Sequence, residues 1–417
     1  MRQSHLAKHA QADRITPIIG SRQAMHLPNR RVFGAPFWNS SLIILAISVF
    51  FNGFGTGVVN ASSTNFFVQV LGLSGTQVLW LQGLREIPGL LLIGIAALLS
   101  RFSLVKRAFG AVALMGIGYA FHAWVGSYSA LIAAAIAASL GFHVWLPLQG
   151  TIGMLLVEKQ YSGQVMGSLA SAGALASLAG MGGVALLANR VPLRWFFVTA
   201  GVLILGAALM LLRLPSELGD TKIPQPRFFF RKRYWLYYVL TFFEGSRIQL
   251  FAAFGNLILV QNYHYTTQQI SLLLSSGLLN FIMAPIFGRW LDQIGERAVL
   301  TSSYTALALC FVGYATIHNG LILGVILVVI NLLTMLSIGL STYVNRIAPP
   351  SELAPTLNSG VSVNHITSVG MALVAGSLLR QVGYELLCWG VVVIILLSVP
   401  FTLAIKRSPE PQEPAAI

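Results

Sequence analysis

The stretch Thr241-Phe242-Phe243-Glu244-Gly245-Ser246-Arg247-Ile248 places two opposite charges inside a long apolar run. Glu244 and Arg247 are three residues apart, so in a helix they share one face and can form an ion pair. Charged side chains at bilayer depth are costly and usually functional. The rest of the sequence must therefore show whether this stretch crosses a membrane.

The composition is that of a membrane protein. Of 417 residues, 56% are hydrophobic and only 9% are charged, and the mean hydropathy is +0.75. Soluble domains contain much less apolar sequence. Runs of about 20 apolar residues, the length of a transmembrane helix, recur along nearly the whole chain. We predict an all-α polytopic membrane protein with 12 transmembrane helices, at 39–61, 76–99, 104–124, 128–156, 163–188, 193–213, 233–258, 268–290, 298–317, 320–344, 355–378 and 386–405.

The positive charges support this list of spans. If both termini are cytoplasmic, 21 of the 26 Lys and Arg residues fall on the cytoplasmic side. Arg190, Arg194 and Arg380 fall outside, while Arg85 and Arg247 lie within spans. This asymmetry follows the positive-inside rule, so the net charge of +14 reflects topology and contact with anionic lipid, and we expect no nucleic-acid partner. We expect a prokaryotic inner membrane, with a monomer as the functional unit.

The two ends and the cysteines complete the outline. Residues 1–36 form a basic arm with no signal-peptide core, expected to lie on lipid in the cytoplasm; an organellar transit peptide is the alternative. Residues 407–417 form a cytoplasmic tail. Cys310 and Cys388 both fall within spans, too few for a disulfide framework or metal cluster. We therefore expect no metal and no cofactor.

The chain contains an internal repeat. An offset of 192 residues, without gaps, aligns Phe50-Phe51-Asn52-Gly53 with Phe242-Phe243-Glu244-Gly245, and also Gln77 with Gln269. The Pro- and Arg-rich segment 214–232 separates the two copies. We predict two six-helix bundles in parallel orientation, 37–213 and 233–406, joined by this cytoplasmic linker.

One loop carries a family signature. Gly288-Arg289-Trp290-Leu291-Asp292-Gln293-Ile294-Gly295-Glu296-Arg297 resembles the loop G-x-x-x-D-x-x-G-x-R/K of the major facilitator superfamily. The resemblance covers about 39–406 and implies a secondary transporter whose halves rock about a midplane substrate site. It also implies a gating latch at Gly288, Asp292, Gly295 and Arg297, in which the Asp caps a helix and pairs with Arg. The first half has no such latch, because Ala96, Ser100 and Ser103 occupy the equivalent positions.

Ionisable and amide side chains at depth are the candidate site. For proton coupling we select Glu244 and Glu86, and buried Glu244 would have its pKa raised by burial and lowered by Arg247. The candidate substrate-binding residues are Arg247, Arg85, Asn52, His143, Asn280, Asn331 and His365. The alternative is structural: an ion pair at Glu244 and Arg247, and a charge network that fixes span two to spans four or eleven.

The geometry around span two separates its two charges. Arg85 and Glu86 are neighbours, so in a regular helix they point about 100° apart and cannot both face one cavity squarely. Pro88 and Gly89 predict a kink just beyond them.

No nucleotide-binding loop or nucleophile motif occurs, so we expect no enzyme, and a gradient must supply the energy. The expected function is alternating-access transport of a small polar or anionic solute, coupled to protons. One alternative is export of amphipathic drug-like compounds, although span five lacks the proline typical of such exporters. The other is a non-transporting receptor or assembly factor on the same fold.

Overall fold

The computed structural model describes residues 38–218, 229–250 and 254–406. The predicted arm 1–36, the tail 407–417 and the middle of the predicted linker lie outside these ranges. Within the described residues the regular structure is helical. The first half holds α1 (Ser40–Asn65), α2 (Gly75–Leu84), α3 (Ile87–Leu90), α4 (Leu92–Leu99), α5 (Leu104–Phe121), α6 (Tyr128–Leu155), α7 (Ser162–Leu187) and α8 (Leu193–Leu211). The second half holds α9 (Trp235–Leu250), α10 (Asn256–Asn262), α11 (Thr267–Ser275), α12 (Leu278–Thr316), α13 (Gly320–Thr334), α14 (Ile338–Ile347) and α15 (Pro350–Leu403).

Eight helices among the described residues are long and apolar enough to cross a membrane. Two of them include a bend, at Gly295 in α12 (φ 79°) and Gly383 in α15 (φ 77°), where only glycine adopts the positive φ easily. Each of these bent helices covers two of the predicted spans. Spans two and seven are broken into shorter helices, so the architecture agrees with the twelve spans expected.

Span two breaks where the sequence predicts a kink. Helix α2 ends at Leu84, and α3 begins at Ile87 with Pro88 in its first turn. Proline has no N–H to donate, so it favours the first turn of a helix over the interior. The break turns Arg85 and Glu86 into a short connection between two helices.

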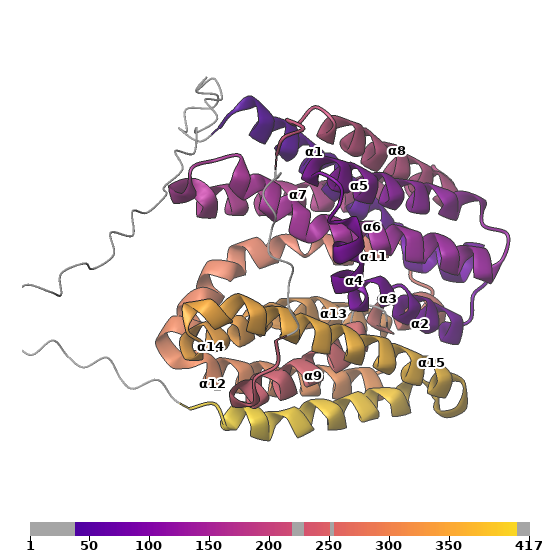
Figure 1. The fold of residues 1–417 in the computed structure, drawn as a ribbon. Coiled ribbons are helices and arrows are strands. Elements are labelled where there is room, and N and C mark those ends of the chain that lie inside the picture. Colours follow the sequence, from indigo (N-terminus) through magenta and orange to yellow (C-terminus); the bar gives the residue numbers. More distant parts are fainter. Residues whose placement is uncertain (1–37, 219–228, 251–253, 407–417) are drawn as a thin grey trace, which may run out of the picture.

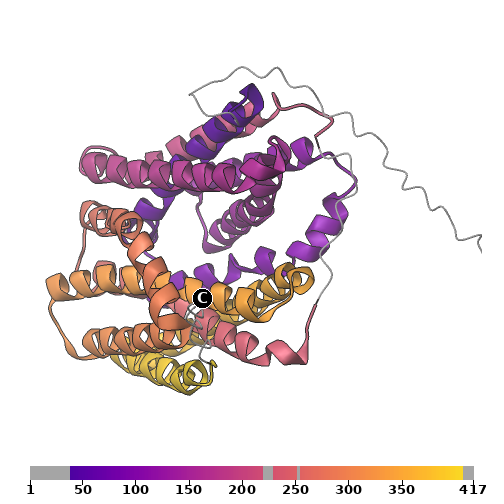
Figure 2. The same cartoon turned by 90° about the vertical axis from the view of Figure 1, so that its left-hand side faces the viewer.

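The helices form two groups, seen as two layers in Figures 1 and 2. In the first, coloured indigo to magenta, α1 packs on α7 and α8, and α5 packs on α6 and α8. In the second, α15 packs on α9 and α12. We call the side that holds Asn39 and Ile405 the terminal side, and the opposite side, with the connections 71–74 and 263–266, the far side.

The two groups meet from the far side to the middle of the molecule. Asn65 donates to the carbonyl of Tyr265 at 2.8 Å, and the Asn189 amide donates to Gln268 at 3.0 Å. Helix α2 packs against α15, where the Trp80 indole donates to the carbonyl of Leu373 at 3.2 Å. The hydrogen bonds of Asn65, Asn189 and Trp80 to the other group all lie in this far-side half. The groups are therefore held together at the far side.

The internal repeat extends to local structure. Ser74 and Gln77 form a capping box at the start of α2, and Thr266 and Gln269, each 192 residues later, form the same box at the start of α11. A capping box satisfies two free backbone N–H groups at a helix start. Equivalent helices of the two halves thus begin at equivalent residues.

Candidate functional site

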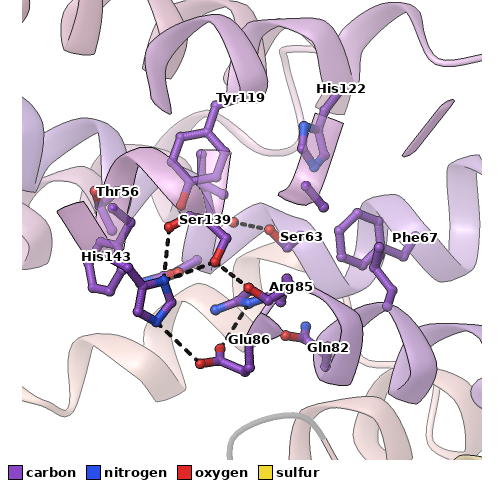
Figure 3. A pocket seen from close by; sticks show the side chains of 15 residues that line it. Thr56, Ser63, Phe67, Gln82, Arg85, Glu86, Tyr119, His122, Ser139 and His143 are labelled. Carbon is purple, nitrogen blue, oxygen red and sulfur yellow. Dashed lines mark hydrogen bonds and ion pairs between the residues drawn. The ribbon is translucent and has the colours of Figure 1, made fainter. Parts of the chain in front are cut away.

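A cavity of about 130 Å³ opens at the centre of the first group (Figure 3). Arg85 and Glu86 both line it, although a regular helix would point them apart. The expectation that only one of them faces the cavity is wrong, because α2 ends before Arg85 and the pair lies in the connection to α3. Its other polar lining residues are Thr56, Asn60, Ser63, Gln82, Tyr119, His122, Ser139 and His143.

Glu86 connects the two groups of helices at this cavity. Its Oε2 atom lies 3.5 Å from Nε2 of His143 on α6, in the same group. The same Oε2 lies 3.2 Å from Nδ1 of His365 on α15, in the other group. The second oxygen, Oε1, lies 3.5 Å from Nε of Arg85. Three residues predicted separately from the sequence thus form one cluster around a carboxylate.

The hydrogen bonds of Ser139 determine which nitrogen of His143 carries a proton. The Ser139 hydroxyl donates its proton to the carbonyl of Arg85. The Ser139 carbonyl, 2.9 Å from Nδ1 of His143, can only accept. Nδ1 therefore carries a proton, and Nε2 faces Oε2 of Glu86. Either a proton or a metal ion on Nε2 can join this nitrogen to the carboxylate oxygen.

Gly89 makes room for this cluster. A Cβ atom at this position would lie 2.8 Å from Nε2 of His143 and 2.9 Å from Cε1 of His365. Such contacts are closer than van der Waals packing allows, so any side chain here would displace both rings. The absence of a side chain at Gly89 therefore allows His143 and His365 to approach each other.

Glu244 and Arg247 form an ion pair inside the second group. Arg247 is 1% exposed and Glu244 is 4% exposed. The guanidinium carbon of Arg247 lies 3.6 Å from the ring centre of Tyr304 on α12, and the Tyr304 hydroxyl donates to Oε2 of Glu244 at 3.3 Å. Oε1 of Glu244 and two guanidinium nitrogens have no hydrogen-bond partner among the described residues. Tyr304 was missed by sequence reasoning because a tyrosine in an apolar run gives no sign of a partner 60 residues away.

A second cavity, of about 230 Å³, adjoins this ion pair. Glu244 lines it, but Arg247 does not. Its lining is rich in hydroxyl and amide groups, from Tyr237, Thr241, Ser337, Ser341 and Asn364. The structure thus brings the carboxylate of the predicted pair to a polar cavity and leaves the guanidinium in the interior.

The three predicted asparagines line neither cavity. Asn52 is 7% exposed, and its amide nitrogen has no partner among the described residues. The side-chain oxygen of Asn280 is also buried without such a partner, and Asn331 is half-buried on α13. Their assignment to substrate binding stays a prediction.

The signature loop is a turn between two membrane-spanning segments. Gly295 provides the positive φ, and Asp292 is exposed and forms no ion pair with the described residues. Instead, Glu296, 7% exposed, pairs with Arg346 on α14 at 2.8 Å. Gly288 and Arg297 flank this turn. The paired carboxylate in this loop is therefore Glu296 and not Asp292. Glu296 follows Gly295 at a position where the family signature allows any residue.

Comparison with known proteins agrees with these features. The family model for the Major Facilitator Superfamily matches residues 45–354 and 237–416. No curated protein sequence matches the chain. Among solved structures, the nucleoside transporter NupG has 16% identity over 88% of this chain and 98% of its own, with a TM-score of 0.71.

Two further structures share the fold. A peptide transporter, POT, has 14% identity over 91% of this chain and 96% of its own, with a TM-score of 0.72. A D-xylose-proton symporter has 13% identity over 88% and 97%, with a TM-score of 0.65. The family and the fold indicate a transporter and not an enzyme. This chain belongs to the major facilitator superfamily, as a multi-pass membrane protein of transporter fold.

Proposed function

We propose that the protein is a secondary active transporter that moves a small polar or anionic solute by alternating access, coupled to protons. The observation that carries the proposal is the position of Glu86, whose carboxylate contacts the first group through His143 and the second through His365. A charged contact between two halves that move relative to each other responds to solute bound beside it. Transporters of this architecture bind solute near the midplane between their halves.

The contacts between the groups favour one conformation of an alternating cycle. The described hydrogen bonds between the groups lie in the far-side half, at Asn65, Trp80 and Asn189. With the termini in the cytoplasm, as the distribution of Lys and Arg predicts, this conformation is closed to the outside. The opposite conformation has to break these far-side contacts.

Arg85 is the proposed anchor for an anionic group of the solute. Its side chain is 42% exposed and lines the cavity, whereas the guanidinium of Arg247 is buried against Tyr304. Arginine binds carboxylates through two parallel hydrogen bonds, which favours it as an anchor for an anion. Arg247 then acts through Glu244, whose charge it balances.

Glu244 is the proposed carrier of the coupling proton. It is a buried carboxylate at the edge of a polar cavity, with one oxygen free of hydrogen bonds to the described residues. Protonation of Glu244 would weaken its pairing with Arg247 and so change the contacts of both residues with Tyr304 on α12. This links a proton to the position of helices in the second group.

Transport in proteoliposomes tests this proposal. Purified protein is screened with radiolabelled lactate, succinate, glutamate, uridine and xylose under an imposed pH gradient. We expect the parent to accumulate a carboxylate solute, and Glu244→Gln to exchange it across the membrane without accumulation. Glu158→Gln, an exposed carboxylate that bonds only Gln160 among the described residues, is the control.

Each outcome separates the alternatives. If Glu244→Gln accumulates solute as well as the parent, Glu244 does not carry the coupling proton. If the parent moves none of the five solutes but exports lipophilic dyes, the amphipathic exporter replaces our proposal. If the parent neither transports any of these solutes nor exports the dyes, the non-transporting receptor is favoured.

A further inference from the structure

We infer that Glu86, His143 and His365 form a binding site for a divalent transition-metal ion of the Zn²⁺ type, which joins the two groups of helices. The three residues each offer a ligand atom, and these atoms lie within 4.8 Å of one another. Two imidazoles and one carboxylate are a common ligand set for Zn²⁺, with a fourth position left for water. The inference does not depend on the proposed transport function.

The distances from the carboxylate to the two imidazoles are close to those between ligands of one metal ion. A tetrahedral Zn²⁺ ion with bonds of about 2.0–2.2 Å holds its ligand atoms about 3.3–3.5 Å apart. Oε2 of Glu86 is 3.5 Å from Nε2 of His143 and 3.2 Å from Nδ1 of His365. N–H···O hydrogen bonds are usually near 2.9–3.0 Å. Both carboxylate–imidazole distances are therefore close to the spacing of ligands around a shared ion, and the two ring nitrogens lie within 4.8 Å of each other.

The surrounding bonds orient the ligands as metal sites require. Histidine ligands usually donate their other ring N–H to a carbonyl or carboxylate, which fixes the ring and the tautomer. Nδ1 of His143 has this bond, to the carbonyl of Ser139 at 2.9 Å, and leaves Nε2 as the lone pair that faces Glu86. Arg85 contacts the other carboxylate oxygen at 3.5 Å, so Oε2 remains for the ion.

The site is enclosed enough to hold an ion. His143 is 7% exposed, and the side chains of Glu86 and His365 are 15% and 18% exposed. Gly89 allows the two rings to approach, since a Cβ there would lie within 2.9 Å of both. His365 belongs to the second group while the other two ligands belong to the first, so an ion on all three holds the groups in this conformation.

Isothermal titration of the purified full-length protein with ZnCl₂ tests the inference. We expect one Zn²⁺ site with micromolar or tighter affinity. Loss of an outer partner typically weakens a metal site about 10–100-fold. We therefore expect His143→Ala and His365→Ala each to weaken binding by at least about 100-fold, and Gly89→Ala by about 10-fold. Gly94→Ala, on the same span with no atom within 4 Å of an added Cβ, should bind like the parent.

Other histidines need their own control. His5, His9 and His26 lie in the N-terminal arm, and His318 has a side chain that is 65% exposed. Substituting these four by glutamine should leave the Zn²⁺ affinity unchanged. If that variant loses the site, or if His365→Ala binds Zn²⁺ as tightly as the parent, the inference is wrong.

Two further measurements keep the test independent of variants that fold poorly. Co²⁺ should give the visible absorption of a tetrahedral site in the parent and not in His365→Ala. Zn²⁺ should raise the thermal unfolding temperature of the parent, because a ligand that binds only the folded state stabilises it. A well-folded parent that shows neither effect at millimolar metal contradicts the inference.

Discussion

Arg247 shows how one buried charge is accommodated. Its guanidinium contacts the carboxylate of Glu244 and lies 3.6 Å from the ring centre of Tyr304. The Tyr304 hydroxyl donates to the same carboxylate at 3.3 Å. An uncompensated buried charge costs several kcal/mol, so removing either partner is expected to destabilise the fold strongly. The aromatic ring of Tyr304 also stabilises the positive charge of Arg247, through a cation–π contact.

Substitutions of Tyr304 separate the ring from the hydroxyl. Tyr304→Phe keeps the ring under Arg247 and loses only the hydrogen bond to Glu244, which we expect to cost about 1 kcal/mol. Tyr304→Leu also loses the cation–π contact, worth about 2 kcal/mol when it is desolvated. Unfolding of both variants in detergent measures the difference. Equal destabilisation by Phe and Leu would show that the ring does not stabilise Arg247.

The sequence predicts individual residues better than their partners. Hydropathy and charge are sufficient to select Glu86, His143 and His365, because polar residues in apolar runs are conspicuous. Their assembly around one carboxylate depends on three spans that lie far apart in the chain, so no local spacing reveals it. The expectation of no metal site rested on the two cysteines, which are too few for a metal cluster, and did not consider a glutamate and two histidines from three spans.

Among the elements, α9 and α15 illustrate contact through a small residue. A Cβ on Gly245 would lie 2.1 Å from Oγ1 of Thr367 and 2.4 Å from the carbonyl of Asn364. In the first half, a Cβ on Gly53 of α1 would meet the carbonyl of Gly173 on α7 in the same way. His365, next to Asn364, is 192 residues after Gly173, so the two helix crossings occupy equivalent positions in the repeat. The Phe-Phe-x-Gly repeat therefore marks where two helices cross closely. The sequence could identify the repeat but not the neighbouring helix.

The starts of the same two helices are joined by a titratable pair at the terminal side. Arg233, just before α9, pairs with Glu352 at the start of α15, and Tyr234 donates to the same carboxylate at 2.8 Å. The hydrogen bond from Arg233 lowers the pKa of Glu352 below its ordinary value of 4.5. A lowered pKa in the folded state stabilises the fold above the unfolded pKa, and this contribution is lost as the pH falls through the folded value.

We therefore expect acid to weaken the joint between α9 and α15. The thermal unfolding temperature of the parent should fall as the pH drops below about 4.5, the ordinary value of the Glu352 pKa. Glu352→Gln should start from a lower unfolding temperature at pH 7 and show a shallower fall. Identical pH profiles for the two proteins would exclude a contribution from this pair.

For the whole molecule, the number and repeat of the spans follow from the sequence. Both can be predicted from length, hydropathy and the 192-residue offset without knowing which helices are in contact. The conformation cannot be predicted from the sequence, because it depends on whether the two groups meet at the terminal side or at the far side. The breaks at Pro88 and Gly295 are predictable in part, since proline and glycine favour helix ends and kinks. They do not always break a helix, because Pro147 and Pro285 lie inside helices.

We propose that the two groups separate at the far side during transport. The side-chain amides of Asn189 and Gln268, one in each group, lie in hydrogen-bond contact there, so a cysteine pair at these positions spans the contact between the groups and is a candidate for disulfide formation. The pair is introduced after Cys310 and Cys388 have been replaced by alanine.

The most direct test is uptake of the transported carboxylate by Asn189→Cys/Gln268→Cys protein in proteoliposomes, before and after oxidation and again after reduction. Our account predicts that oxidation abolishes uptake and that reduction restores it, while either single cysteine variant is unaffected by oxidation. Full uptake by the oxidised, cross-linked protein would contradict alternating access between these two groups.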